Sequence, residues 1–279
     1  MSADPMSTRR PAIGVFDSGF GGLTVLKALI ELIPDADYFY FGDTARLPYG
    51  SKSVETVARY AVEATHFLEQ RGAQLLVIAC NTATALALDK IVLGSGVPVV
   101  GVVEPGAESA SQASKNRKVV VIGTEATVSS HAYLKALEIR GVQAKEKACP
   151  LLVPLVEEGW VEHNVTEQVA RIYLREAFSN GFEDADVLVL GCTHYPLIKP
   201  VLRRVAPNHV AIVDSAESTA QVVKDLLRSK QLPPQGGIER RELPRLKFFA
   251  TDSVEKFKAL GARFLGVPIR DVKHVDLKE

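Results

Sequence analysis

The chain has 279 residues, 47% of them hydrophobic and 24% charged, which is an ordinary composition for one large or two small globular domains. Lysine plus arginine and aspartate plus glutamate both number 33, so there is no overall basic field to hold nucleic acid or an anionic membrane. No apolar run reaches the ~20 residues that span a bilayer, and three cysteines without a C-x-x-C pair argue against a disulfide framework.

Residues 1–11 are polar and lack the apolar core of a secretory signal. We therefore expect a short disordered tail and a protein that stays in the cytoplasm, where thiols remain reduced. Beyond the tail, apolar runs typical of buried strands alternate with amphipathic stretches. These runs are Ala12–Phe16, Asp37–Phe41, Gln74–Ala79, Val97–Val103, Val119–Ile122, Val187–Leu190 and Val210–Val213. Apolar residues recur at helical spacing from Val54 to Leu68, with Gly72 as a stop signal, and the alternation predicts an α/β fold.

Two parts of the chain resemble each other at an offset of 112 residues. The matching pairs are Leu75–Thr82 with Val187–His194 and Val97–Glu104 with His209–Ala216. The simplest interpretation is a protein of two pseudo-symmetric halves, each a mostly parallel sheet flanked by helices, with an active site in the cleft between them. The alternative is that buried strands resemble one another by chance.

The repeat predicts two α/β domains. Residues 12–103 together with 215–279 form the first in this prediction, and residues 104–214 form the second. The segment after residue 214 is assigned to the first domain because that half is the expected place for it to pack. Its expected elements are a helix through Leu227, a loop at Leu232–Gly237, a strand near Lys247–Ala250 and a helix near Ser253–Leu260.

Small polar residues gather where the predicted strands end. They are Asp17-Ser18-Gly19, Gly42-Asp43-Thr44, Cys80-Asn81-Thr82, Glu104, Thr124 and Cys192-Thr193-His194. Open parallel sheets bind ligands at this edge. Because a helical segment follows each strand, free N–H groups and the positive helix end should favour a carboxylate and lower a thiol pKa from its usual ~8.5.

Two of the cysteines, Cys80 and Cys192, end matching strands in the two halves, whereas Cys149 is interpreted as a buried structural residue. If the halves face each other, two thiols flank one cleft. Such a pair suits removal of a proton from one face of a carbon and delivery to the other face. The alternatives are a Cys80–Cys192 redox pair and a zinc site that also uses His194, although C-x-H is not a usual chelating spacing.

A glycine-rich stretch, Asp17–Gly22, follows the first predicted strand. It fails the G-x-G-x-x-G dinucleotide spacing because Thr24 occupies the third glycine position, and it lacks a P-loop lysine. A tight turn explains the glycines. The segment Arg46–Ser51 is predicted to be a loop over the same edge, where Tyr49 and backbone N–H groups could close on a ligand.

Four motifs together resemble the glutamate racemases of the aspartate/glutamate racemase superfamily, over about Ile13 to Glu217. They are GVFDSGFGGLT from Gly14, GDTARLPYG from Gly42, ACNTA from Ala79 and GCTHYPLI from Gly191. The resemblance implies two pseudo-symmetric α/β domains with the substrate between them, and neither pyridoxal phosphate nor a metal. It also implies a role in supplying D-glutamate for bacterial peptidoglycan. The family often forms homodimers, while the sequence itself does not give the oligomeric state.

The resemblance also implies roles for individual residues. Cys80 would take the proton from D-glutamate and Cys192 from L-glutamate, with Asp17 helping the first thiol and His194 the second. Glu157 matches the family's carboxylate on the His194 side, although the neighbouring Glu158 leaves that choice open. The implied substrate contacts are Asp17, Ser18, Tyr49, Gly50, Asn81, Thr82, Thr124, Thr193 and His194.

Other functions stay open at the level of sequence. An aspartate or hydantoin racemase of the same superfamily differs in substrate length by as little as one methylene, worth only ~1–3 kcal/mol. A non-catalytic protein that binds a small acidic ligand is the alternative from another class, although it would not need two paired thiols.

Overall fold

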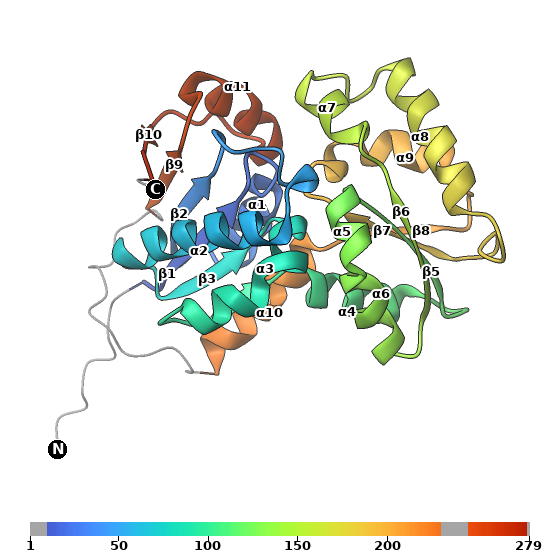
Figure 1. The fold of residues 1–279 in the computed structure, drawn as a ribbon, viewed down its shortest axis with the longest axis horizontal. Helices are drawn as coiled ribbons and strands as arrows, with labels where there is room; N and C mark the ends of the chain where they lie inside the picture. The colour runs from blue at the N-terminus through green and yellow to red at the C-terminus, as the bar shows by residue number, and fades with distance from the viewer. Residues whose placement is uncertain (1–9, 230–244, 278–279) are drawn as a thin grey trace.

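The computed structural model describes residues 10–229 and 245–277. It confirms the α/β fold, with two sheets that lie side by side in two lobes, each sheet flanked by helices (Figure 1). Most of the predicted disordered tail and the predicted loop at Leu232–Gly237 lie outside the described residues. In the part of the chain that the structure describes, no helix is long and apolar enough to cross a membrane.

The first sheet has six strands in the order β10-β9-β2-β1-β3-β4, and all neighbours are parallel. Its strands are β1 (Ala12–Asp17), β2 (Asp37–Gly42), β3 (Leu75–Ile78), β4 (Val99–Gly101), β9 (Leu246–Ala250) and β10 (Val272–His274). Its helices are α1 (Leu23–Leu32), α2 (Val54–Gln70), α3 (Asn81–Gly94), α10 (Ala216–Arg228) and α11 (Val254–Leu265). Along β1, Ile13 and Val15 join the apolar cluster that contains α1 and α11, whereas Phe16 joins the cluster under α2 and α3. The sheet is therefore buried on both faces, as its apolar runs predict.

The second sheet has four parallel strands in the order β6-β5-β7-β8. These are β5 (Lys118–Gly123), β6 (Gln143–Ala148), β7 (Val187–Gly191) and β8 (Ala211–Asp214). Its helices are α4 (Val103–Ala113), α5 (Glu125–Ser130), α6 (Ala132–Ile139), α7 (Leu152–Glu157), α8 (Asn164–Ala177) and α9 (Lys199–Val205). The order β6-β5-β7-β8 repeats the order β2-β1-β3-β4 of the first sheet, so β3 corresponds to β7 and β4 to β8. These are the strands that match at the 112-residue offset in the sequence.

The sequence-based description needs correction at four points. The predicted strand Val97–Val103 is shorter, because β4 ends at Gly101 and Val103 begins α4. Glu104 therefore lies on a helix and not at a strand end, and its exposed carboxylate pairs with Arg140 at 2.8 Å. Strand β6 was not predicted, because its sequence QAKEKA is polar and lies at the edge of the sheet. The last helix, α11, runs five residues beyond Leu260.

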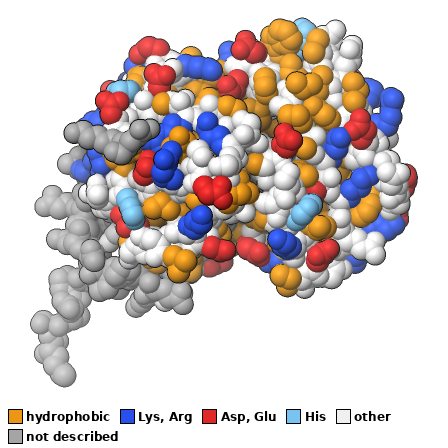
Figure 2. All heavy atoms as spheres, viewed as in Figure 1, with side chains coloured by type: hydrophobic (Ala, Val, Ile, Leu, Met, Phe, Trp, Pro, Cys, Tyr) orange, Lys and Arg blue, Asp and Glu red, His pale blue; other side chains and the backbone are white. Residues whose placement is uncertain are grey.

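The C-terminal strands β9 and β10 extend the first sheet next to β2, and α11 packs on α1. The exact domain boundaries stay a prediction. Figure 2 shows basic and acidic side chains interspersed on one face of the molecule, as expected from their equal numbers. In each sheet the order changes direction between two adjacent strands, β1 and β3 in the first sheet and β5 and β7 in the second. This switch point is where doubly wound sheets open a crevice at their carboxyl ends.

Candidate active site

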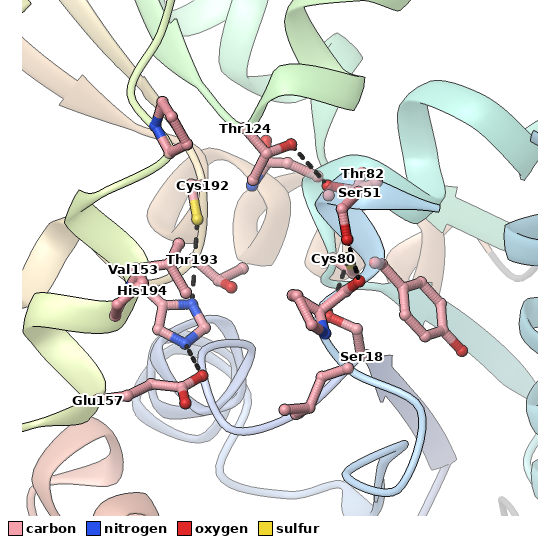
Figure 3. Close-up of a pocket in the computed structure, with 18 of the residues that line it drawn as sticks. Ser18, Ser51, Cys80, Thr82, Thr124, Val153, Glu157, Cys192, Thr193 and His194 are labelled. Carbon is pink, nitrogen blue, oxygen red and sulfur yellow. Dashed lines mark hydrogen bonds and ion pairs between the residues drawn. The ribbon is translucent and has the colours of Figure 1, made fainter. Parts of the chain in front are cut away.

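A cavity of about 370 Å³ lies between the two halves, at the carboxyl ends of their central strands (Figure 3). Its walls from the first half are the turn after β1, the loop Leu47–Ser51 and the start of α3. From the second half come Thr124, helix α7 up to its last residue, Glu157, and the segment after β7. A cavity of this size holds a small molecule.

Cys80 caps the N-terminus of α3 and is 5% exposed. Its sulfur accepts a hydrogen bond from the Ala83 N–H at 3.4 Å and lies 3.5 Å from the Ser18 hydroxyl. Burial raises the pKa of Cys80 to about 12, and the nearby charge of Asp17 adds to the rise. The prediction that the helix N-terminus lowers the pKa of this thiol is therefore wrong, because desolvation outweighs the hydrogen bonds. At neutral pH Cys80 is a protonated thiol.

Cys192 lies one residue beyond β7 and begins a chain of polar contacts. Its sulfur is 3.9 Å from His194 Nδ1, and His194 Nε2 is 3.3 Å from the Glu157 carboxylate (Figure 3). Burial alone would lower the pKa of His194, but its contacts with Cys192 and Glu157 raise the pKa to about 10. His194 is therefore an imidazolium at neutral pH, and it places a positive charge beside the Cys192 sulfur. The segment after β7 forms only a 3-10 turn at Tyr195–Ile198, and no α-helix begins at Cys192. The positive charge beside the Cys192 sulfur therefore comes from His194 and not from the end of an α-helix.

Figure 3 shows Cys80 and Cys192 on opposite sides of the cavity, which both residues line. All three cysteines of the chain are free thiols. The described residues hold no group of three or more His, Cys, Asp or Glu side chains arranged to bind a metal, so the alternative zinc site at Cys80, Cys192 and His194 gains no support.

Asp17 ends β1 and is fully buried. One carboxylate oxygen accepts the Gly19 N–H at 2.9 Å, and the other lies 3.5 Å from the Thr193 hydroxyl of the second half. Burial raises the pKa of Asp17, and the charge of His194 opposes that rise. Asp17 does not line the cavity, and the described residues show no hydrogen bond between it and Cys80. Its predicted roles as helper of Cys80 and as substrate contact stay predictions.

The other predicted contact residues all line the cavity: Ser18, Tyr49, Gly50, Asn81, Thr82, Thr124, Thr193 and His194. The Tyr49 hydroxyl donates to Asp43 at 2.5 Å, and Asp43 does not line the cavity. Thr82 and Thr124, from different halves, are hydrogen-bonded through their hydroxyls at 2.9 Å. Asn81 Oδ1 accepts from the Tyr133 hydroxyl at 2.7 Å, while Asn81 Nδ2 is buried with no partner among the described residues. This amide is a free donor for a ligand.

Helix α11 contributes two contacts that the sequence did not predict. Lys256 lies 3.4 Å from the second carboxylate oxygen of Glu157, and the Phe264 ring meets His194 edge-on with centroids 5.3 Å apart. The C-terminal segment thus supports the Cys192 side of the cavity from the first half. Nothing in the local sequence of α11 signals these contacts, since their partners lie about 100 and 70 residues away along the chain.

Glu157→Gln should shift the alkaline limb of the pH profile to lower pH. His194 is protonated below about pH 10, and the Glu157 charge favours that form. Without the charge the pKa of His194 falls by roughly one unit, so the limb of kcat/KM moves down by a similar amount. Glu158→Gln is the matched control, since Glu158 lines the cavity but forms no ion pair with His194 in the described chain. A limb moved by Glu158→Gln alone would reassign the carboxylate.

Gly21→Ala should displace side chains that line the cavity, although Gly21 itself does not line it. A Cβ at Gly21 would lie 2.2 Å from the Thr193 hydroxyl oxygen and 2.8 Å from His194 Nδ1, so both must move. A displacement near 1 Å can reduce kcat/KM by about 10²-fold. Gly96→Ala is the control, because its new Cβ would be 3.6 Å from the nearest atom, an ordinary contact. Wild-type kinetics in Gly21→Ala would show that the position of His194 does not matter.

The chain matches known proteins along nearly its whole length. The Asp/Glu/hydantoin racemase family model matches residues 13–223. A glutamate racemase of Koribacter versatilis is 59% identical, covering 98% of this chain and 99% of that one. The solved glutamate racemase of Francisella tularensis in complex with D-glutamate has a TM-score of 0.86 and 34% identity, covering 97% and 99% of the two chains. That of Thermus thermophilus in complex with β-chloro-D-alanine has a TM-score of 0.83 and 45% identity, covering 97% and 98%.

Proposed function

The chain belongs to the Asp/Glu/hydantoin racemase family, and we propose that its reaction is the interconversion of L-glutamate and D-glutamate by two cysteines without a cofactor. The observation that carries the proposal is the pair Cys80 and Cys192. The two thiols follow corresponding strands, β3 and β7, and line one cavity from opposite sides. A small acidic substrate in that cavity would present its α-carbon between them.

In the proposed mechanism the two sulfurs exchange roles in each turnover. Cys192, beside the His194 imidazolium, removes the α-proton of L-glutamate as a thiolate. Cys80, whose high pKa keeps it protonated, delivers a proton to the opposite face. The forward step leaves Cys80 as a thiolate and Cys192 as a thiol, and in the reverse direction this Cys80 thiolate takes the proton of D-glutamate while Cys192 returns one. Asp17 then assists Cys80, while Glu157 holds His194 through the 3.3 Å ion pair.

The α-proton of an amino acid is far less acidic than a thiol, so the site must stabilise the carbanion-like state. We assign this task to hydrogen-bond donors that line the cavity and to the exclusion of water by the two halves. Asn81 Nδ2 is a buried donor without a partner in the described chain, and the hydroxyls of Ser18, Thr82, Thr124 and Thr193 surround the same space. Tyr49 and Gly50 belong to the loop Leu47–Ser51, which forms one wall of the cavity.

The wider biological role is part of the same proposal. The enzyme would act in the cytoplasm and supply D-glutamate for peptidoglycan synthesis, and a homodimer is its proposed assembly. The ligand of the cavity is a small molecule, glutamate. In this proposal the protein binds neither nucleic acid nor a membrane.

The test is incubation of the protein with L-glutamate in heavy water, followed by chiral separation and by the NMR signal of the α-proton. We expect D-glutamate to form and deuterium to enter the α-carbon, with much slower turnover of L-aspartate. Faster turnover of L-aspartate would assign the chain to an aspartate racemase. Binding of glutamate without loss of the α-proton signal would point to a non-catalytic binder.

A further inference from the structure

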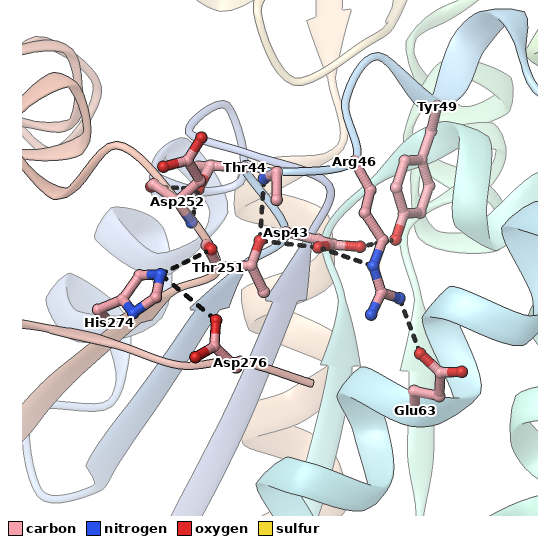
Figure 4. Close-up of polar contacts among 10 residues, drawn as sticks. Asp43, Thr44, Arg46, Tyr49, Glu63, Thr251, Asp252, His274 and Asp276 are labelled. Carbon is pink, nitrogen blue, oxygen red and sulfur yellow. Dashed lines mark hydrogen bonds and ion pairs between the residues drawn. The ribbon is translucent and has the colours of Figure 1, made fainter. Parts of the chain in front are cut away.

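A buried carboxylate, Asp43, lies one residue beyond β2 and has no part in the proposed mechanism. Its side chain is fully buried and accepts two hydroxyl hydrogen bonds, from Tyr49 at 2.5 Å and from Thr251 at 2.9 Å (Figure 4). The Arg46 guanidinium lies 3.8 Å from the same carboxylate. Burying a carboxylate is costly, so these hydrogen bonds and the nearby guanidinium must compensate its lost hydration.

The direction of these hydrogen bonds follows from the other partners. Thr251 Oγ1 already accepts the Ala45 N–H at 2.9 Å, so its own hydrogen points to Asp43. Among the described residues the Tyr49 hydroxyl forms a hydrogen bond only with Asp43, so it donates there as well. Burial raises the pKa of Asp43, and these hydroxyls together with Arg46 oppose the rise. Asp43 therefore acts as an acceptor at both oxygens.

These bonds join two segments that are more than 200 residues apart. The first is the loop Leu47–Ser51, every residue of which lines the cavity. The second is the end of β9, where Thr251 and Asp252 lie. Thr44 adds two hydrogen bonds between the neighbouring backbone and the segment after β9. Its hydroxyl donates to the Asp252 carbonyl at 2.5 Å and accepts the Asp252 N–H at 2.9 Å.

The loop that Asp43 holds contacts both the surroundings of Cys80 and the second half. The rings of Tyr49 and Phe16 pack against each other with their centroids 6.2 Å apart, in the apolar cluster that also contains Cys80. At Gly50 the loop meets the second half so closely that an added Cβ would lie 2.9 Å from the Thr124 Cβ. A small shift of this loop would therefore open the cavity above Cys80.

We propose that Asp43 is a positioning residue, which sets the active-site wall Leu47–Ser51 by fixing Tyr49 to Thr251 of the C-terminal segment. What the wall encloses rests on the proposed function, but the role of Asp43 in closing the wall over Cys80 does not. Thr251 lies beyond residues 13–223, the part of the chain that matches the family model. The C-terminal segment, none of whose described residues lines the cavity, thereby supports the cavity wall through Asp43.

Three variants test the proposal. Asp43→Asn replaces one acceptor oxygen with an NH2 group. Thr251→Val removes the hydroxyl while keeping the shape of the side chain, and Thr251→Ser keeps the hydroxyl as the conservative rescue. The first readout is the alkylation rate of Cys80 by iodoacetamide, resolved by peptide mass, at a pH where the wild-type rate is measurable. Cys149, fully buried and outside the cavity, reports global opening in the same sample.

We expect Asp43→Asn and Thr251→Val to speed alkylation of Cys80 by about tenfold with Cys149 unchanged, and Thr251→Ser to match wild type. The second readout is steady-state kinetics, in which KM for both enantiomers of glutamate should rise about tenfold, with a smaller fall in kcat. Unchanged Cys80 alkylation and unchanged KM in Asp43→Asn and Thr251→Val would overturn the proposal, even if both variants melt at lower temperature. A wild-type protein that does not racemise glutamate would overturn the proposed function alone, because the alkylation result still decides the role of Asp43.

Discussion

Cys80→Ala and Cys192→Ala are each expected to abolish inversion of glutamate, and any hydrogen exchange that remains should be confined to one enantiomer. With Cys80 removed, only the face toward Cys192 keeps a base, so only L-glutamate can lose its α-proton. With Cys192 removed, the same holds for D-glutamate at Cys80. Each variant lacks one of the two groups that transfer the proton, so kcat/KM should fall by about 10²- to 10⁴-fold or more.

The measurement is chiral chromatography of the product together with α-proton NMR in heavy water, starting from each enantiomer. Because the two enantiomers have equal free energy, kcat/KM must fall equally in both directions, and this equality checks the data. Cys149→Ala is the matched control, since this buried thiol contacts the Lys147 carbonyl and lies outside the cavity. Turnover comparable to wild type in either active-site variant, or exchange of the wrong enantiomer, would contradict the two-thiol assignment.

His194→Asn is expected to have the next largest effect, a fall in kcat of about 10²-fold with the fold retained. The imidazolium is the only cation in contact with the Cys192 sulfur among the described residues, at 3.9 Å. A buried thiolate without a positive neighbour is costly, so removal of the α-proton by Cys192 should be much slower. Steady-state kinetics in both directions and thermal unfolding measure the two parts of this prediction.

His131→Asn serves as its control. His131 pairs with Glu146 at 2.8 Å in the second half, outside the cavity, and asparagine tolerates its left-handed backbone conformation. We expect its kinetics to match wild type. Equal losses of kcat in the two histidine variants would mean that His194 acts through the stability of the fold and not through Cys192.

Much of the fold could be predicted because parallel strands buried on both faces leave continuous apolar runs. The repeat could be predicted because β3 and β7 carry the same pattern, including a cysteine just beyond each strand. Strand β6 was not predicted because it lies at the edge of the sheet and its charged sequence contains no continuous apolar run. Glu104 was misplaced because sequence does not reveal where β4 ends and α4 begins.

The candidate site was harder to predict where the properties of a residue depend on its burial or on contacts with residues far away in the sequence. The position of Cys80 at a helix N-terminus is local, but its pKa depends on desolvation by both halves, which no local pattern shows. Lys256 and Phe264 reach the Glu157–His194 pair from a helix whose own sequence gives no hint of it. Asp43 stands in a motif that the sequence singles out, yet its partner Thr251 lies 208 residues away.

A crystal structure of the protein with D-glutamate bound tests the central claim most directly, namely that Cys80 and Cys192 address one carbon atom from its two faces. The account predicts the substrate α-carbon between the two sulfurs, each within about 4 Å of it and on opposite sides. A ligand bound with both sulfurs on the same side of the α-carbon, or with one sulfur out of reach, would contradict it.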